Sequence, residues 1–262
     1  MKDLTIGFIG LGLIGGYIAR GIKRSRRDVR IMAYMRSRDK LEQAKRDGVV
    51  DVILDGIGEE ISWCDLVFLC TLVEYNASYL EQIRPLLKPG ALVTDVGSTK
   101  TDIHETVKRL GMEEVFVGGH PMAGSEKTGY ENSTDHLLEN AYYMITPTEK
   151  STPEQIGRIR RVALSIGAIP MVTDYRQHDF SVAAVSHLPH LVASSLVNLV
   201  RDNDNEEELM RTIAAGGFKD ITRIASSSPV MWEQICMTNT ENIKVLLRRY
   251  IQSLETIYEE LD

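Results

Sequence analysis

A histidine stands in a segment whose residue types could carry proton chemistry. Segment 118–126 reads GGHPMAGSE, which puts His120 between two glycines and a proline. These neighbours disfavour a helix, so we interpret the segment as a constrained turn that fixes the imidazole. A histidine pKa of about 6.5 suits a general base near neutral pH. The flanking glycines favour a functional role over a structural one.

A second polar segment follows another predicted strand. Residues 95–100 read DVGSTK and come directly after the apolar run over 91–95. In open α/β sheets, ligands bind outside the carboxyl ends of the strands. We therefore expect DVGSTK and GGHPMAGSE to lie at one edge of a sheet, where preorganised side chains contribute most to a reaction.

A glycine-rich turn near the start of the chain predicts a dinucleotide site. An apolar run over 4–9 precedes GLGLIGG (10–16), and an amphipathic stretch follows to about Lys23. The three glycines would make a tight turn, let the backbone approach a pyrophosphate, and let helix and strand pack closely. The helix N-terminus then offers N–H groups to the phosphates. The expected cofactor contacts are Gly10, Gly12, Leu13, Ile14 and Gly15.

Strand and helix patterns continue to alternate along the first two thirds of the chain. Further strands are predicted over 29–34, 65–69, 91–95, 115–118, 142–145 and 169–172, and helices over 39–47, 79–87, 100–109 and 153–166. This alternation predicts an α/β fold, a doubly wound and mostly parallel Rossmann-type sheet over residues 1–174. Thr71 lies just past the third strand and is expected at the cofactor edge, although an ordinary loop role stays open.

The residues after the second strand bear on the choice of cofactor. NAD-binding units place an acidic residue about 20 residues past the glycine turn. Here Met35 occupies that position, and Arg36, Ser37 and Arg38 follow. Guanidinium groups match phosphate geometry, so this favours NADP over NAD. The alternative is two solvated arginines at a helix start. The nearby Asp39 is interpreted as a helix N-cap.

The last third of the chain predicts an all-helical domain over 175–262. Segment 181–200 is apolar on most faces and contains Pro189, which should kink it. It has the length of a membrane span, but two histidines and several serines favour a buried helix crossing a domain or dimer core. A long amphipathic stretch covers 233–261. Such apolar helices often complete their core by dimerisation, so we expect a homodimer.

Bulk composition narrows the function classes. The chain has 262 residues, 43% of them hydrophobic, and a net charge of −7 without a long basic run. This argues against nucleic-acid binding, and an anionic substrate would need local cations. The N-terminal residues do not resemble a signal peptide, and no uninterrupted apolar run has membrane-spanning length. Three cysteines without CxxC spacing indicate reduced thiols, so we expect a cytoplasmic protein.

Five segments together carry a family resemblance over essentially the whole chain. GLGLIGG, DVGSTK, GGHPMAGSE, SHLPH and GGFKDITRIASSSPVMW, in this order and spacing, resemble the prephenate/arogenate dehydrogenases of tyrosine biosynthesis. The resemblance implies oxidative decarboxylation of prephenate to 4-hydroxyphenylpyruvate, with hydride transfer to NAD(P)+. Arogenate, which would give tyrosine directly, is the alternative substrate.

The resemblance also implies roles for individual residues. His120 resembles the catalytic histidine that takes the proton from the C4 hydroxyl. Ser98 resembles the serine that orients this histidine and contacts the same hydroxyl. Arg223 resembles the arginine that binds the anionic substrate, as the two carboxylates of prephenate require. A surface salt bridge is the alternative for Arg223.

Four more positions resemble substrate-region residues. His190 matches a side-chain-carboxylate contact typical of prephenate-using members. Trp232 matches a tryptophan that reaches the substrate region, with a contact across the dimer left open. Glu126 and Asp220 match acidic residues of an ionic network at the mouth of the site. Core packing remains open for Trp232, and ordinary ion pairs or caps for the two acids. His187 with His190 would mimic a metal pair, but no third ligand is evident, so we predict no metal.

Rival functions and departures from the family can be weighed on the same residues. A β-hydroxyacid dehydrogenase would rely on a lysine early in the helical domain, and none occurs between Lys150 and Lys219. A non-catalytic NADP(H)-binding redox sensor would explain the glycine turn but not His120, Ser98 and Arg223 together. The missing acid after the second strand puts NAD preference in doubt. The length leads us to expect no ACT-type regulatory domain.

Overall fold

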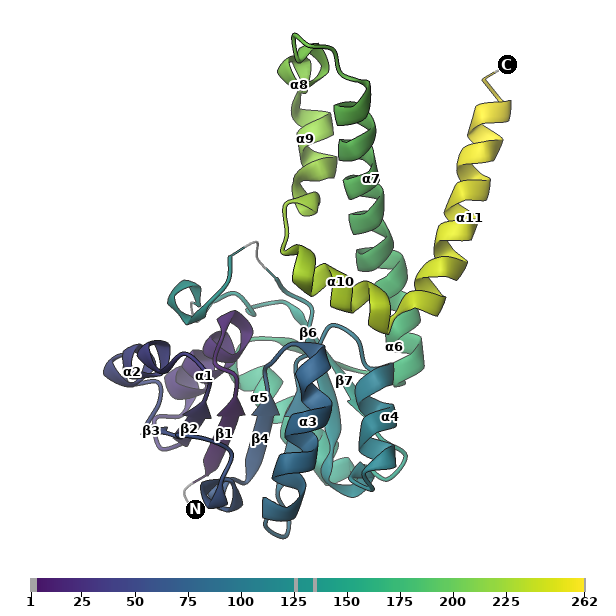
Figure 1. The fold of residues 1–262 in the computed structure, drawn as a ribbon. Coiled ribbons are helices and arrows are strands. Elements are labelled where there is room, and N and C mark those ends of the chain that lie inside the picture. Colours follow the sequence, from purple (N-terminus) through teal and green to yellow (C-terminus); the bar gives the residue numbers. More distant parts are fainter. Residues whose placement is uncertain (1–3, 125–126, 134–135, 262) are drawn as a thin grey trace. The chain divides into compact units, whose positions relative to one another are not determined.

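The computed structural model describes residues 4–124, 127–133 and 136–261. The chain forms two compact units, Met1–His178 and Asp179–Asp262, which are described separately below (Figure 1). The sequence places the boundary after residue 174. The compact units part after His178, inside the helix that begins at Tyr175.

A five-stranded parallel sheet is the frame of the first unit. Its strands are β1 Thr5–Ile9, β2 Arg30–Tyr34, β3 Val52–Ile53, β4 Leu66–Leu69 and β5 Leu92–Asp95, in the order β3-β2-β1-β4-β5. The helices are α1 Leu13–Ser25, α2 Arg38–Arg46, α3 Val73–Ile83, α4 Thr101–Arg109 and α5 Pro153–Ser165 (Figure 1). The predicted doubly wound, Rossmann-type sheet is confirmed.

Helices cover both faces of this sheet, and successive strand residues point to opposite faces. Phe8 and Phe68 lie on one face and stack with ring centroids 5.0 Å apart. That face packs against apolar residues of α1, α2 and α5. Ile9 and Leu69, each one residue later, join the opposite core with residues of α3 and α4. The near-continuous apolar strands of the sequence follow from this double coverage.

A second, smaller sheet follows in the same unit. Strands β6 Val117–Pro121, β7 Tyr142–Pro147 and β8 Ile169–Val172 lie in the order β6-β7-β8. β6 and β7 are antiparallel, whereas β7 and β8 are parallel. A parallel bridge between Val93 and Phe116 links β5 to the residue just before β6.

Two helix starts differ from the sequence prediction. Helix α3 begins at Val73, whereas the sequence predicts a start at Tyr79. The apolar pattern of the sequence does not extend through the first turn, because that turn contains the polar but buried Asn76. The Oδ1 atom of Asn76 accepts a hydrogen bond from the Thr71 hydroxyl at 3.0 Å. The N-cap of α2 is Ser37 rather than Asp39, which lies in the first helical turn.

The second unit is helical. Helix α6 Tyr175–Val182 enters it and is followed by a π-helical turn Ala183–His187, α7 Leu188–Asn203, α8 Leu209–Ile213, α9 Gly216–Thr222, α10 Pro229–Thr238 and α11 Thr240–Glu259. The π-helical turn ends just before α7, whose first turn contains Pro189, so the irregularity lies at the predicted kink. The predicted continuous stretch 233–261 is interrupted at Asn239.

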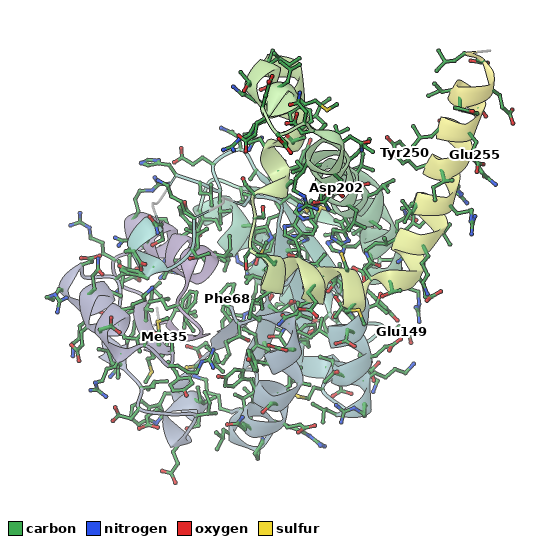
Figure 2. All side chains as sticks on the ribbon, turned by 45° about the horizontal axis from the view of Figure 1, so that its top comes forward. Met35, Phe68, Glu149, Asp202, Tyr250 and Glu255 are labelled. Atoms are coloured by element: carbon green, nitrogen blue, oxygen red, sulfur yellow. The ribbon has the colours of Figure 1, made fainter. Side chains whose placement is uncertain are left out.

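Much apolar surface of the second unit is exposed. The expected buried helix over 181–200 buries Ala193 and a few residues near its start, while Val185 and Leu199 are exposed. The helical stretch Tyr175–Asn203 is long and apolar enough to cross a membrane by length and composition, a test that the core helix of a soluble protein also passes. Helix α11, along which Tyr250 and Glu255 lie, buries only Ile243 among its described residues (Figure 2).

Candidate active site

The glycine turn between β1 and α1 has the backbone geometry that each glycine was predicted to need. Gly10 has φ +87° and its N–H donates to the Tyr34 carbonyl at 2.8 Å. A Cβ atom on Gly10 would lie 2.6 Å from the Cys70 carbonyl oxygen. A Cβ on Gly12 would meet open space, whereas one on Gly15 would lie 2.8 Å from the Gly10 carbonyl oxygen. The turn therefore leaves room above Gly12 and packs tightly at Gly10 and Gly15.

The remaining predicted cofactor contacts lie around this turn. Leu13 and Ile14 form the first turn of α1, whose N–H groups have no partner inside the helix. Thr71 follows β4, and its Cγ2 atom would lie 3.0 Å from a Cβ on Gly10. A pyrophosphate at the helix N-terminus fits this arrangement, because backbone donors converge on an open space.

A cavity of about 290 Å³ lies at the end of β2, where Figure 2 marks Met35. It is lined by Tyr34, Met35, Arg36, Arg38, Leu41, Leu54 and Asp55. The Arg36 guanidinium lies 5.4 Å from the ring centroid of Tyr75. The Arg38 guanidinium instead forms an ion pair with Asp55 and lies 3.6 Å from Glu42. Sequence reasoning missed Asp55, because the two-residue strand β3 that precedes it gives little signal.

A buried ion pair organises the DVGSTK segment. Asp95 and Lys100 are fully buried and paired, and the Lys100 ammonium donates to the Gly119 carbonyl at 2.8 Å. The Oδ2 atom of Asp95, which pairs with Lys100, also accepts a hydrogen bond from the Gly97 N–H at 2.8 Å. The Oδ1 atom accepts one from the Gly119 N–H at 3.1 Å. Ser98 lies half-buried within this loop. The loop that carries Ser98 is therefore tied to the residue before His120.

His120 lies in strand β6, so the predicted constrained turn is wrong. It pairs with Met144 in the β6–β7 register and is half-buried. The preceding glycine is required because a Cβ on Gly119 would lie 2.7 Å from the Asp95 carbonyl oxygen and 2.8 Å from the Tyr143 hydroxyl. The glycines thus serve close packing between neighbouring strands rather than a turn.

The imidazole of His120 has a second histidine as its neighbour. Its Nδ1 atom lies 2.9 Å from the Nε2 atom of His178 on α6, and the two rings are 71° apart in orientation. His178 is buried. His178 lies outside the motifs quoted from the sequence, 58 residues along the chain from His120, so the motifs alone did not identify it.

In the helical unit, His190 and Trp232 come together. Their rings stack with centroids 3.6 Å apart and planes 3° apart. The Nδ1 atom of His190 lies 3.0 Å from the Ile224 carbonyl oxygen. Because a carbonyl only accepts, Nδ1 carries the hydrogen and the neutral ring presents a lone pair at Nε2. Burial lowers the pKa of His190, and the hydrogen bond to Ile224 offsets part of this effect.

The other predicted substrate residues differ in their surroundings. Arg223 and Asp220 are both exposed, at and just before the end of α9. His187 is buried, and its Nδ1 atom lies 3.2 Å from the Asn239 side-chain nitrogen, which supports a structural role. Glu126 lies outside the described residues. No group of three or more metal-ligating side chains occurs within residues 4–124, 127–133 and 136–261.

A larger cavity, of about 560 Å³, lies away from the strand ends. Basic side chains line it near the C-terminal end of α1, and Arg20, Lys23 and Arg24 among them form ion pairs within the protein. Arg20 pairs with Asp47 at 2.6 Å and Lys23 with Asp51 at 2.7 Å. We therefore assign the chemistry to the strand ends, where groups suited to proton transfer and phosphate binding gather.

Comparison with known proteins shows a family match over most of the chain. The family description "Prephenate dehydrogenase, nucleotide-binding domain" matches residues 18–172, and "Prephenate dehydrogenase, dimerization domain" matches 174–262. The chain is 37% identical to the prephenate dehydrogenase of Bacillus subtilis over 98% of its own length and 70% of that protein.

Two solved structures are similar over nearly the full chain. One is prephenate dehydrogenase from Aquifex aeolicus in complex with hydroxyphenyl propionate and NAD+, with TM-score 0.92, 32% identity and coverage of 100% of this chain and 91% of that one. The other is Synechocystis arogenate dehydrogenase, with TM-score 0.86, 31% identity and coverage of 98% and 92%.

Proposed function

The chain belongs to the prephenate dehydrogenase family, and we propose that it converts prephenate to 4-hydroxyphenylpyruvate by oxidative decarboxylation. The observation that carries this proposal is His120 at the end of β6, held next to the buried loop that contains Ser98. A titratable imidazole fixed at the edge where a dinucleotide binds suits removal of a hydroxyl proton during oxidation.

The protein's own groups account for the proton and the charges. A dinucleotide held at the glycine turn between β1 and α1 would supply a nicotinamide as the hydride acceptor for C4 of the ring. His120 takes the proton of the C4 hydroxyl, and Ser98 orients His120 and contacts the same hydroxyl. Loss of CO2 then makes the ring aromatic, and the C4 oxygen takes a proton back from His120. Ser98 and His120 lie on segments tied through Asp95 and Gly119, which limits their relative movement.

Anion recognition is proposed for residues of the helical unit. Arg223 supplies an exposed guanidinium for a substrate carboxylate, and His190 contacts the side-chain carboxylate. Asp220 and Glu126 are proposed for an ionic network at the mouth of the site. Trp232, which stacks on His190, is proposed to reach the substrate region. These roles follow the family resemblance residue by residue.

The dinucleotide fits the glycine turn, and we propose NADP over NAD. Arg36, at the cavity that follows β2, is the residue best suited to a 2′-phosphate. Arg38 contributes less than the sequence implies, because it is paired with Asp55. Ser37 occupies the N-cap position of α2 without a side-chain capping hydrogen bond, and the N-terminus of the helix lies in the same region.

A homodimer in the cytoplasm completes the proposal. The apolar side chains of Leu254 and Ile257 on α11 are 46% and 52% exposed in the single chain, which a partner subunit would cover. Cys64, Cys70 and Cys236 are all unpaired, as in a reducing compartment. Burial raises the pKa of the Cys64 thiol to about 11, so this thiol is unreactive.

Arogenate is the second candidate substrate, because a similar solved structure is an arogenate dehydrogenase. A non-catalytic redox sensor is the distant alternative. One absorbance assay separates the three functions by crossing prephenate and arogenate with NAD and NADP and following reduced nicotinamide. Reduction with prephenate supports the proposal, and reduction with arogenate alone transfers it to that substrate. A folded protein that binds dinucleotide but reduces none in any mixture would be a sensor.

A further inference from the structure

We propose that His178 is a positioning residue that fixes the tautomer of His120 and stabilises its protonated form. The inference rests on the proposed function, in which His120 is the base. The contact that carries it is the 2.9 Å separation between Nδ1 of His120 and Nε2 of His178. His178 is 1% exposed, so bulk water does not readily replace it as the partner.

The chemistry of the base selects one of the two possible hydrogen-bond directions. With His178 bound at Nδ1, His120 must accept the substrate proton at Nε2. A neutral imidazole has one N–H and one lone pair, so a lone pair at Nε2 requires the hydrogen at Nδ1. Nδ1 of His120 therefore donates and Nε2 of His178 accepts. The opposite direction would leave Nε2 of His120 protonated and unable to act as a base.

The same contact stabilises the charge that forms during the reaction. When His120 takes the substrate proton at Nε2 it becomes an imidazolium, and its Nδ1–H becomes a stronger donor. An acceptor already in place spares reorganisation at that moment. His178 thus acts through His120 rather than on the substrate.

The surrounding structure fixes the ring of His178. Asp174 caps α6, since its Oδ1 atom accepts from the N–H groups of Arg176 and Gln177 at 2.8 and 3.1 Å. The Tyr175 ring stacks on His104 of α4 with centroids 4.3 Å apart. The first turn of α6, from which His178 projects, is therefore held against the α/β unit.

The same anchor reaches the strand that carries His120. His104 Nε2 lies 3.0 Å from the Thr146 hydroxyl on β7, and Thr146 pairs with Gly118 on β6. A Cβ on Gly118 would lie 2.3 Å from the Thr146 hydroxyl and 2.9 Å from His104 Nε2. The glycine two residues before His120 thus makes room for the group that anchors α6, and both histidines depend on one packed cluster.

Other titratable groups surround the histidine pair on several elements. They are Asp95 at the end of β5, Lys100 just before α4, His104 on α4, Tyr143 on β7, Asp174 just before α6 and Asp179 on α6. All of them remain in a variant that changes His178 alone. A change in pH dependence that appears only in such a variant therefore reports His178.

Two substitutions and one control test the proposal. His178→Leu removes the acceptor, and we expect kcat with prephenate to fall on the order of 10²-fold, as for a misplaced catalytic group. The acidic limb of the kcat/KM profile should move to lower pH, because the His120 imidazolium loses its acceptor. His178→Gln retains an acceptor oxygen at a similar reach and should recover a large part of kcat. His136→Gln, at an exposed histidine, should match the wild type.

A spectroscopic measurement on the wild type does not depend on whether a variant folds. Nitrogen-15 NMR of the histidine side chains reports which ring nitrogen of His120 carries hydrogen. Hydrogen at Nδ1 supports the proposal, and hydrogen at Nε2 of the neutral ring overturns it. It is also overturned if both His178 variants lose the same activity with an unmoved acidic limb, or if His178→Leu retains wild-type kcat. Wild-type protein without turnover would instead remove the proposed function, while the NMR result still decides the tautomer.

Discussion

Lys100 and Asp95 form a fully buried ion pair that joins the end of β5 to strand β6 through Gly119. The carboxylate and the ammonium each bind Gly119, one through its N–H and the other through its carbonyl. Gly119 precedes His120, and Ser98 lies between the two charged residues in sequence. The pair therefore sets the spacing of the proposed catalytic groups as well as contributing to the fold.

Replacing Lys100 with methionine should destabilise the protein strongly. The substitution leaves the Asp95 carboxylate buried without its partner, which costs about 3–5 kcal/mol in comparable pairs. Denaturant unfolding followed by circular dichroism measures the change. Arg109→Met removes an exposed pair with Glu81 in the same unit and should cost about 1 kcal/mol or less. Equal small losses in both variants would contradict a structural role for the buried pair.

Replacing His120 with asparagine should lower kcat by about 10²–10⁴-fold, as expected for loss of a general base. Dinucleotide binding and the KM for prephenate should change little, because the loss falls on the transition state. Steady-state kinetics and a dinucleotide titration provide the two measurements. The exposed His136, changed to asparagine, is the matched control. Unchanged kcat in His120→Asn would remove our central assignment.

Replacing Arg36 with alanine should weaken NADP and spare NAD. Hydrogen bonds to charged groups contribute about 1.5–3 kcal/mol, so the affinity for NADP should fall roughly tenfold or more. Arg38→Ala should have a smaller effect because that guanidinium is already paired with Asp55. Isothermal titration with both dinucleotides distinguishes these outcomes. Equal weakening of NAD and NADP would indicate that Arg36 contacts a part common to both.

The KM for prephenate should rise with pH because of His190. Burial holds the pKa of this imidazole below its ordinary value, so the ring is largely neutral near pH 7 and presents a lone pair at Nε2. The substrate carboxylate needs a hydrogen-bond donor at Nε2, so its binding requires protonation of His190. The free-energy cost of this protonation increases as pH rises. His190→Asn should raise KM far more than it lowers kcat and should flatten its pH dependence. An unchanged KM in that variant would refute the contact.

Placing charges on α11 should separate the proposed dimer. Leu254→Asp with Ile257→Asp would put two carboxylates on a surface that the partner is expected to cover. Light scattering after size-exclusion chromatography should give the mass of one chain for this variant and two for the wild type. Gln252→Glu, on the same helix, is the control and should stay dimeric. A wild-type protein that already elutes as one chain would contradict the dimer.

The sequence by itself determined the elements whose signals are local. GLGLIGG directly after an apolar run predicted the turn that Gly10 makes with positive φ, because only glycine adopts that backbone readily. Strand and helix alternation predicted the doubly wound sheet, because both of its faces are buried and its strands are apolar throughout. DVGSTK and GGHPMAGSE were predicted to lie at one edge of the sheet, and the hydrogen bond from the Gly119 N–H to Asp95 joins these two segments.

Only the tertiary structure decided how the site is assembled. The glycines beside His120 indicated a turn, but they lie in a strand. They are needed there because neighbouring groups pack against the backbone, and this close packing cannot be recognised from the local sequence. The sequence predicts Arg38 as a phosphate ligand, whereas in the structure Arg38 pairs with Asp55, which follows the short strand β3. His178 meets His120 across 58 residues of chain. Such pairings depend on which elements pack together, so they arise from long-range packing rather than from a motif.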